Sequence, residues 1–137
     1  MLHQATCVAI AGRGVLIEGP PGSGKSSLAL ALIDRGAVLV GDDGVALATR
    51  AGRLLASPAP ATAGLIEIRN VGLVTLPFEN EVPVALVLRL DREAPRFIEV
   101  AERRELAGIE VPLVRLWPDS PVLPLRAEAA LARYGRN

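Results

Sequence analysis

The sequence is poor in cysteine, in net charge and in long apolar runs, and each shortage excludes a class of protein. One cysteine, Cys7, in 137 residues excludes an internal disulfide, and a small buried thiol is its expected state. Fifteen basic residues balance fifteen acidic ones, so nothing indicates a nucleic-acid partner or an anionic membrane surface. No apolar run reaches the roughly 18 residues of a membrane span, and residues 1–4 lack the basic region of a signal peptide. We therefore expect a cytoplasmic protein that forms a single domain over residues 1–137.

Lysine is also scarce, and its one occurrence is informative. Lys25 is the only lysine, and every other residue counted as basic is an arginine. It falls inside the segment Gly19-Pro20-Pro21-Gly22-Ser23-Gly24-Lys25-Ser26, which matches the P-loop motif G-x-x-x-x-G-K-[ST] in full. A compact ammonium group on a flexible stem suits a phosphate cradle better than a planar guanidinium group does.

The order of apolar segments and turn residues predicts an α/β fold. A P-loop core would consist of a strand, the P-loop, a helix and a strand, followed by additional antiparallel strands and few helices. An ordinary P-loop nucleotide kinase would have several more long crossover helices, so the shortage of helices argues against that group. Predicted strands or short apolar segments cover residues 6–10, 15–18, 38–40 (a buried parallel strand), 45–49, 53–56, 65–69, 73–76, 84–90 and 111–116, the helices cover 26–35 and 125–134, and 57–63 is a loop.

The P-loop motif, residues 19–26, predicts a site for the phosphates of a nucleoside triphosphate. Its glycines let the backbone N–H groups approach phosphate oxygens, and the helix that follows adds a partial positive charge. We expect Lys25 to bind the β and γ phosphates and the Ser26 hydroxyl to bind Mg²⁺. A glycine turn before a helix that binds nothing is the alternative. The predicted nucleotide-binding residues are Gly19, Pro20, Pro21, Gly22, Ser23, Gly24, Lys25, Ser26 and Ser27.

Two adjacent carboxylates, Asp42 and Asp43, follow the predicted strand 38–40. The carboxyl end of such a strand opens onto the same crevice as the P-loop. There a carboxylate can orient Mg²⁺ or accept a proton from an attacking hydroxyl, although a solvated turn is the alternative. Taken alone, Glu67 on a short strand and Arg96 on the surface look ordinary, and His3 lies at an end of the chain that is expected to fray.

Three segments together resemble the catalytic domain of the HPr kinase/phosphorylase family. These segments are the P-loop motif, then Leu39-Val40-Gly41-Asp42-Asp43, then Leu65-Ile66-Glu67-Ile68-Arg69 with Gly72. The likeness covers roughly residues 3–100. It is greatest to the short alphaproteobacterial form of that domain, which lacks an N-terminal domain.

This resemblance implies a function and assigns roles. The family uses ATP, with Mg²⁺, to phosphorylate a serine of the phosphocarrier protein HPr, and many members also run the reverse phosphorylase reaction. By resemblance Asp43 accepts the proton of the serine hydroxyl beside Asp42, Lys25 binds phosphate, and Ser26 and Glu67 bind the metal. Arg96 and His3 match the family's later catalytic arginine and its histidine near the first strand. The resemblance leaves a homo-oligomeric assembly open.

Two other functions remain as alternatives at this point. A nucleotide-binding regulatory module without phosphotransfer would carry the same P-loop and bind a partner protein instead. A small-molecule kinase would also carry it, although no lid-like segment with spaced arginines is visible.

Overall fold

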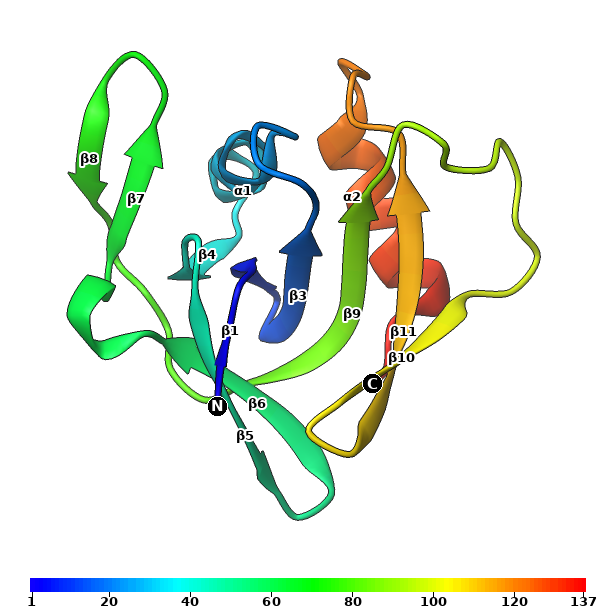
Figure 1. Ribbon diagram of the computed structural model, residues 1–137, viewed down its shortest axis with the longest axis horizontal. Coiled ribbons are helices and arrows are strands. Elements are labelled where there is room, and N and C mark those ends of the chain that lie inside the picture. Colours follow the sequence, from blue (N-terminus) through cyan, green and yellow to red (C-terminus); the bar gives the residue numbers. More distant parts are fainter.

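The computed structural model describes residues 1–137 and consists mainly of strands (Figure 1). Two α-helices, α1 (Lys25–Asp34) and α2 (Leu123–Tyr134), and one short 3₁₀ helix (Pro60–Thr62) accompany them. The strands are β1 (Leu2–His3), β2 (Thr6–Ile10), β3 (Arg13–Glu18), β4 (Val38–Gly41), β5 (Val45–Arg50), β6 (Arg53–Pro58), β7 (Leu65–Ile68), β8 (Gly72–Thr75), β9 (Val82–Leu90), β10 (Glu102–Leu106) and β11 (Ile109–Leu116). The α/β class with few helices is thus confirmed.

Strand β9 lies at the centre of the main sheet and has parallel partners on both sides. It pairs with β3 and with β11 in parallel and, near its start, with β6 in the antiparallel sense. The carboxyl ends of β3, β9 and β11 therefore meet at one edge, toward the top of Figure 1. The segments that follow these three ends can contribute to one site, as in other sheets with parallel strands.

Residues 38–40 form a strand, but the prediction that it pairs in parallel was wrong. The ladder of β4 is antiparallel, to β2, and only one isolated bridge, from Leu39 to Phe78, is parallel. The reason is that β2 and β3 form a tight hairpin, which inserts β2 between β3 and β4. Because β2 runs against both, β4 still points in the same direction as β3 and ends at the same edge.

Both faces of the main sheet are buried. Side chains alternate between the faces along each strand, so Val15 and Ile17 join one core cluster and Leu16 joins the other. The first cluster includes residues of both helices, and the second includes residues of β5, β6 and β10. Burial on two sides accounts for the nearly continuous apolar runs in the sequence. Neither helix is long and apolar enough to cross a membrane.

Two strands were not predicted, and one predicted loop is partly ordered into regular structure. Strand β10 carries charges at four of its five positions and pairs only with β11, as edge strands often do. Strand β1 has two residues and is held to β5, so the expectation that His3 lies in a frayed end was wrong.

In the predicted loop 57–63, β6 continues to Pro58 and the 3₁₀ helix follows. The segments 65–69 and 73–76 form the β7–β8 hairpin.

Candidate functional site

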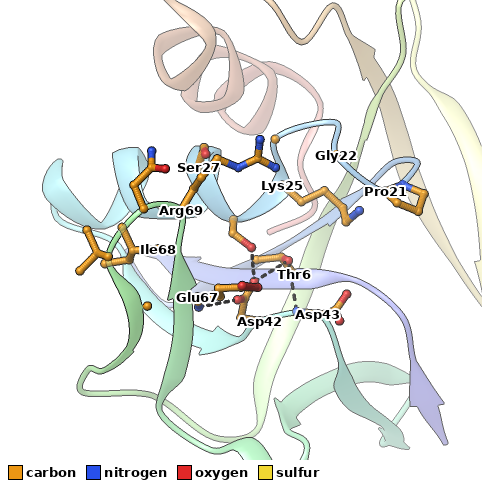
Figure 2. A pocket seen from close by; sticks show the side chains of 15 residues that line it. Thr6, Pro21, Gly22, Lys25, Ser27, Asp42, Asp43, Glu67, Ile68 and Arg69 are labelled. Carbon is orange, nitrogen blue, oxygen red and sulfur yellow. Dashed lines mark hydrogen bonds between the residues drawn. The ribbon is translucent and has the colours of Figure 1, made fainter.

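A cavity of about 560 Å³ opens beside the amino end of α1, at the edge where β3 and β4 end (Figure 2). Three segments distant in sequence line it: the P-loop motif with Ser27, the Asp42–Asp43 pair and the β7–β8 hairpin. The lining residues are Thr6, Pro21, Gly22, Gly24, Lys25, Ser26, Ser27, Asp42, Asp43, Glu67, Ile68, Arg69, Asn70, Val71 and Gly72. The sequence prediction had grouped the P-loop, the two aspartates and Glu67 at one site. The structure brings the aspartates, Glu67 and six of the nine predicted nucleotide-binding residues together here, whereas Gly19, Pro20 and Ser23 do not line this cavity.

The P-loop motif has a backbone that only glycine adopts easily. Gly22 and Gly24 have φ angles of 77° and 99°, in the left-handed region. A Cβ atom on Gly19 would lie 2.6 Å from Oγ of Ser23, so the loop closes too tightly for a side chain there. The first turn of α1 has neither a side-chain cap nor an acidic residue. Its N–H groups and partial positive charge are therefore available to an anion.

Lys25 lies over the P-loop. Its Nζ donates hydrogen bonds to the carbonyl oxygens of Gly19, at 3.0 Å, and Pro20, at 3.2 Å. These neutral acceptors leave the positive charge of the ammonium group uncompensated by a carboxylate. The side chain also lines the cavity, so the charge is within reach of an anionic ligand there.

Asp42 is the most connected side chain of the site. Its Oδ1 accepts hydrogen bonds from Oγ of Ser26, at 2.6 Å, and from Oγ1 of Thr6, at 3.1 Å. Its Oδ2 accepts one from the backbone N–H of Glu67, at 3.0 Å. One carboxylate thus fixes α1, β2 and β7 relative to β4, and Figure 2 shows these bonds as dashed lines meeting at Asp42.

Asp43 differs from its neighbour in every one of these respects. Its residue is exposed, its φ angle is 59°, and its carboxylate has no hydrogen-bond or ion-pair partner in the protein. Only its backbone N–H is held, by Oγ1 of Thr6 at 3.3 Å. The left-handed backbone turns the Asp43 side chain away from the group around Asp42, as Figure 2 shows. The site therefore contains one structural carboxylate and one that is available for chemistry.

Glu67 reaches the site through the β7–β8 hairpin. Its backbone is tied to Asp42, and its side chain is exposed and lines the cavity together with Arg69. No three side chains of histidine, cysteine, aspartate or glutamate come close enough to form a metal site by themselves. A metal ion at this place would need further oxygen ligands, from water or from a bound phosphate.

His3 and Arg96 do not line the cavity. His3 Nε2 lies 2.6 Å from Oε2 of Glu18, a buried carboxylate that also pairs with Arg104. Arg96 is exposed in the segment between β9 and β10. The structure therefore gives neither residue a direct contact with the site, and their catalytic roles stay predictions of the resemblance.

Thr6 was missed by the sequence analysis. It is fully buried, and its hydroxyl connects Asp42 to the backbone of Asp43. The signal was a lone polar residue in the apolar segment 5–10, but nothing in the sequence showed that β2 lies beside β4. The register Cys7 to Gly41 places Thr6 next to the aspartates.

Comparisons with known proteins identify a matching family model and similar sequences. A model of the family described as "HPr Serine kinase C-terminal domain" matches residues 1–79, which is more than half of the chain. The HPr kinase/phosphorylase of Mycoplasma mycoides is 30% identical over 98% of this chain and 48% of its own length. That of Streptococcus thermophilus is 35% identical over 80% of this chain and 40% of its own length. The chain thus spans about half, or less, of the curated relatives it matches.

A solved structure is similar over nearly the whole chain. The structure described as the Hpr(Ser) kinase/phosphatase from Coxiella burnetii superimposes with a TM-score of 0.86 and 30% sequence identity. The match covers 96% of this chain and 88% of that one. The likeness therefore extends beyond the residues that the family model matches and includes β9, β10, β11 and α2.

Proposed function

Because the chain belongs to the HPr serine kinase C-terminal domain family, we propose that it uses ATP to phosphorylate a serine of an HPr-type phosphocarrier protein. The names of its relatives support both the kinase reaction and the reverse phosphorylase reaction. We place this activity in the cytoplasm, where ATP is available. The observation that carries the proposal is one cavity in which a P-loop lysine, the Ser26 hydroxyl and an unpaired aspartate come together.

The P-loop motif would bind the phosphates. The left-handed glycines and the uncapped first turn of α1 offer N–H groups to anionic oxygens. Lys25, which donates to two backbone carbonyls, would exchange these neutral acceptors for the charged β and γ phosphates. An ammonium group interacts more strongly with a charged phosphate oxygen than with a neutral carbonyl oxygen, so this exchange favours the bound nucleotide.

The donor set of the cavity suits Mg²⁺. Ser26 and Glu67 supply oxygen atoms, the ligands that this hard cation prefers, and Asp42 orients the Ser26 hydroxyl. Few protein ligands are expected, because Mg²⁺ in phosphate-transfer sites is shared with substrate phosphates and water. When bound, Mg²⁺ would neutralise charge on the β and γ phosphates.

Asp43 would be the general base. Its carboxylate has no protein partner, whereas both oxygens of Asp42 already accept hydrogen bonds. The serine oxygen of the carrier protein would form a bond to the γ phosphorus while the bond to the bridging oxygen breaks. ADP leaves with that oxygen, and the hydroxyl proton passes to Asp43. In the reverse reaction Asp43 would return this proton.

The test is transfer of phosphate from ATP to purified HPr, read by the intact mass of HPr, in the presence of Mg²⁺. We expect an increase of one phosphate with the native protein, at least about a hundredfold slower transfer with Asp43→Asn, and no ATP binding with Lys25→Met. Adding inorganic phosphate to phosphorylated HPr tests the reverse reaction. Asp43→Asn should still bind ATP, which separates the loss of a base from the loss of the nucleotide site.

Two outcomes would reject the kinase assignment. If the native protein binds ATP but leaves HPr unmodified, and a partner protein binds only to the nucleotide-bound form, the chain is a regulatory module. If phosphate is transferred to a metabolite and not to HPr, the chain is a small-molecule kinase.

A further inference from the structure

A second cavity, of about 520 Å³, lies on the other side of the P-loop motif. Residues 20–23 line it on one side, and Arg89, Asp91, Arg92, Arg115 and Pro118 line it from the carboxyl ends of β9 and β11. The two cavities share Pro21 and Gly22, so this part of the loop forms the wall between them. A ligand that crosses the loop could occupy both.

The second cavity has the opposite charge pattern to the first. Three arginines and one aspartate line it, whereas three carboxylates and two cations, Lys25 and Arg69, line the first cavity. Arg115 is fixed in place, because its guanidinium group binds Asp91 at 3.0 Å and Glu102 at 2.7 Å. The backbone N–H of Glu93 and the Arg115 side chain lower the pKa of Asp91, which keeps this partner charged. A guanidinium group held in one orientation offers a flat surface on which a base can stack.

We propose that this second cavity receives the nucleoside part of the triphosphate, with the base stacked on Arg115. The inference rests on the proposed function. In the proposed reaction the γ phosphate must point toward Ser26 and Asp43, and the space in front of Asp43 must admit the serine of the carrier protein. The nucleoside therefore leaves the P-loop on the opposite side, where the second cavity opens.

The lining also predicts how selective this site is. It contains no asparagine, glutamine or aromatic side chain, and the carboxylate of Asp91 is already bound by Glu93 N–H and Arg115. Stacking does not distinguish bases, because every base has a π face. ATP and GTP should therefore bind with dissociation constants within about threefold of each other.

The experiment compares Mg·ATP with Mg·triphosphate, the inorganic chain without a nucleoside. We expect Arg115→Gln to weaken ATP binding about tenfold, as for loss of one stacking surface, and to change triphosphate binding less than about twofold. Arg92→Gln, at a largely exposed position, should act in the same direction even if Arg115→Gln folds poorly. Arg103→Gln is the control, because it removes the same charge from an exposed pair on β10 outside this cavity.

Trp117 gives an independent signal. It is the only tryptophan, it is 44% exposed, and it precedes Pro118 of the cavity wall. Its fluorescence should change when ATP binds and stay unchanged when triphosphate binds. Equal losses of ATP and triphosphate binding in the two variants, or unchanged ATP binding in both, would overturn the nucleoside pocket while the phosphate site stands. A native protein that binds neither ligand would overturn the proposed function and this inference with it.

Discussion

The hydroxyl of Ser26 donates a 2.6 Å hydrogen bond to Oδ1 of Asp42 and so joins the first turn of α1 to the end of β4. The residues are adjacent in space because β4 runs in the same direction as β3, with β2 between them. The bond leaves Asp43, the next residue, as the carboxylate that is free to accept a proton. In the proposed mechanism, orientation of the P-loop serine and acceptance of the proton would thereby be divided between two neighbouring side chains.

Asp42→Asn is expected to lower the free energy of unfolding by about 2 kcal/mol. If the amide oxygen stays on the backbone N–H of Glu67, the new NH₂ group faces the hydroxyls of Ser26 and Thr6, which must turn from donating to accepting, and the charge of the acceptor is lost. Asp43→Asn is the matched control, because its side chain has no partner, and it should leave stability within about 0.5 kcal/mol of native. Urea denaturation of the two variants measures the difference. Equal losses of stability would contradict the division of roles.

Thr6→Val should destabilise the protein and disturb the site, because the shape is kept while the hydroxyl is lost. The variant leaves the N–H of Asp43 without its acceptor and removes one donor to Asp42. We expect a cost of about 1–3 kcal/mol in urea denaturation. Thr6→Ser keeps the hydroxyl and is the control. The hydroxyl has no such role if the serine variant loses as much stability as the valine variant.

Gly41→Ala is expected to cost about 1–3 kcal/mol through overpacking. A Cβ atom there would lie 2.7 Å from Cγ1 of Val45 and 2.8 Å from the carbonyl oxygen of Gly44. Gly44→Ala, three residues away, has no atom within 4 Å of its new Cβ and serves as the control. Thermal unfolding measures the stability of both variants. A Gly41→Ala protein as stable as the native one would show that β4 and β5 can move apart.

Cys7 should not react with a thiol reagent in the native protein. The side chain is fully buried, and burial raises the pKa of the thiol to about 12, so the reactive thiolate is nearly absent at neutral pH. Above the pKa of an exposed thiol, near 8.5, the unfolded chain ionises and the native one does not, so stability should fall as the pH rises. Cys7→Ala should remove this contribution to the loss of stability at alkaline pH. Rapid modification of the native protein at pH 7 would contradict the prediction.

Local patterns in the sequence predicted the elements around the site well. Neighbouring residues encode the glycine-rich loop, the helix after it and the hairpin at 45–56. The structure contains these elements with small shifts at their ends. The aspartate pair could be assigned to the same edge because a strand precedes it. These features depend on short-range periodicity and turn residues.

Long-range pairing could not be predicted in the same way. Thr6 joins the site only because β2 pairs with β4, and Arg89 and Arg115 lie beside each other only because β9 and β11 are parallel. Strand β10 carries four consecutive charged residues, which look like a solvated segment until β11 pairs with it. The wall of the second cavity opposite the P-loop is formed by the ends of the paired strands β9 and β11, and no sequence motif marks that wall.

The central place of β9 has a consequence for how the protein is made. The parallel partner of β3 is synthesised long after it, since Leu16 pairs with Val87, and β11 must come later still. A growing chain that carries only the P-loop and the aspartates therefore exposes the apolar edge of β3 to its surroundings. Folding is slow when it depends on pairing between strands that are distant in sequence, and unpaired strand edges tend to aggregate. Yields of intact protein should consequently depend on the pace of translation and on chaperones that shield β3 until β9 has left the ribosome.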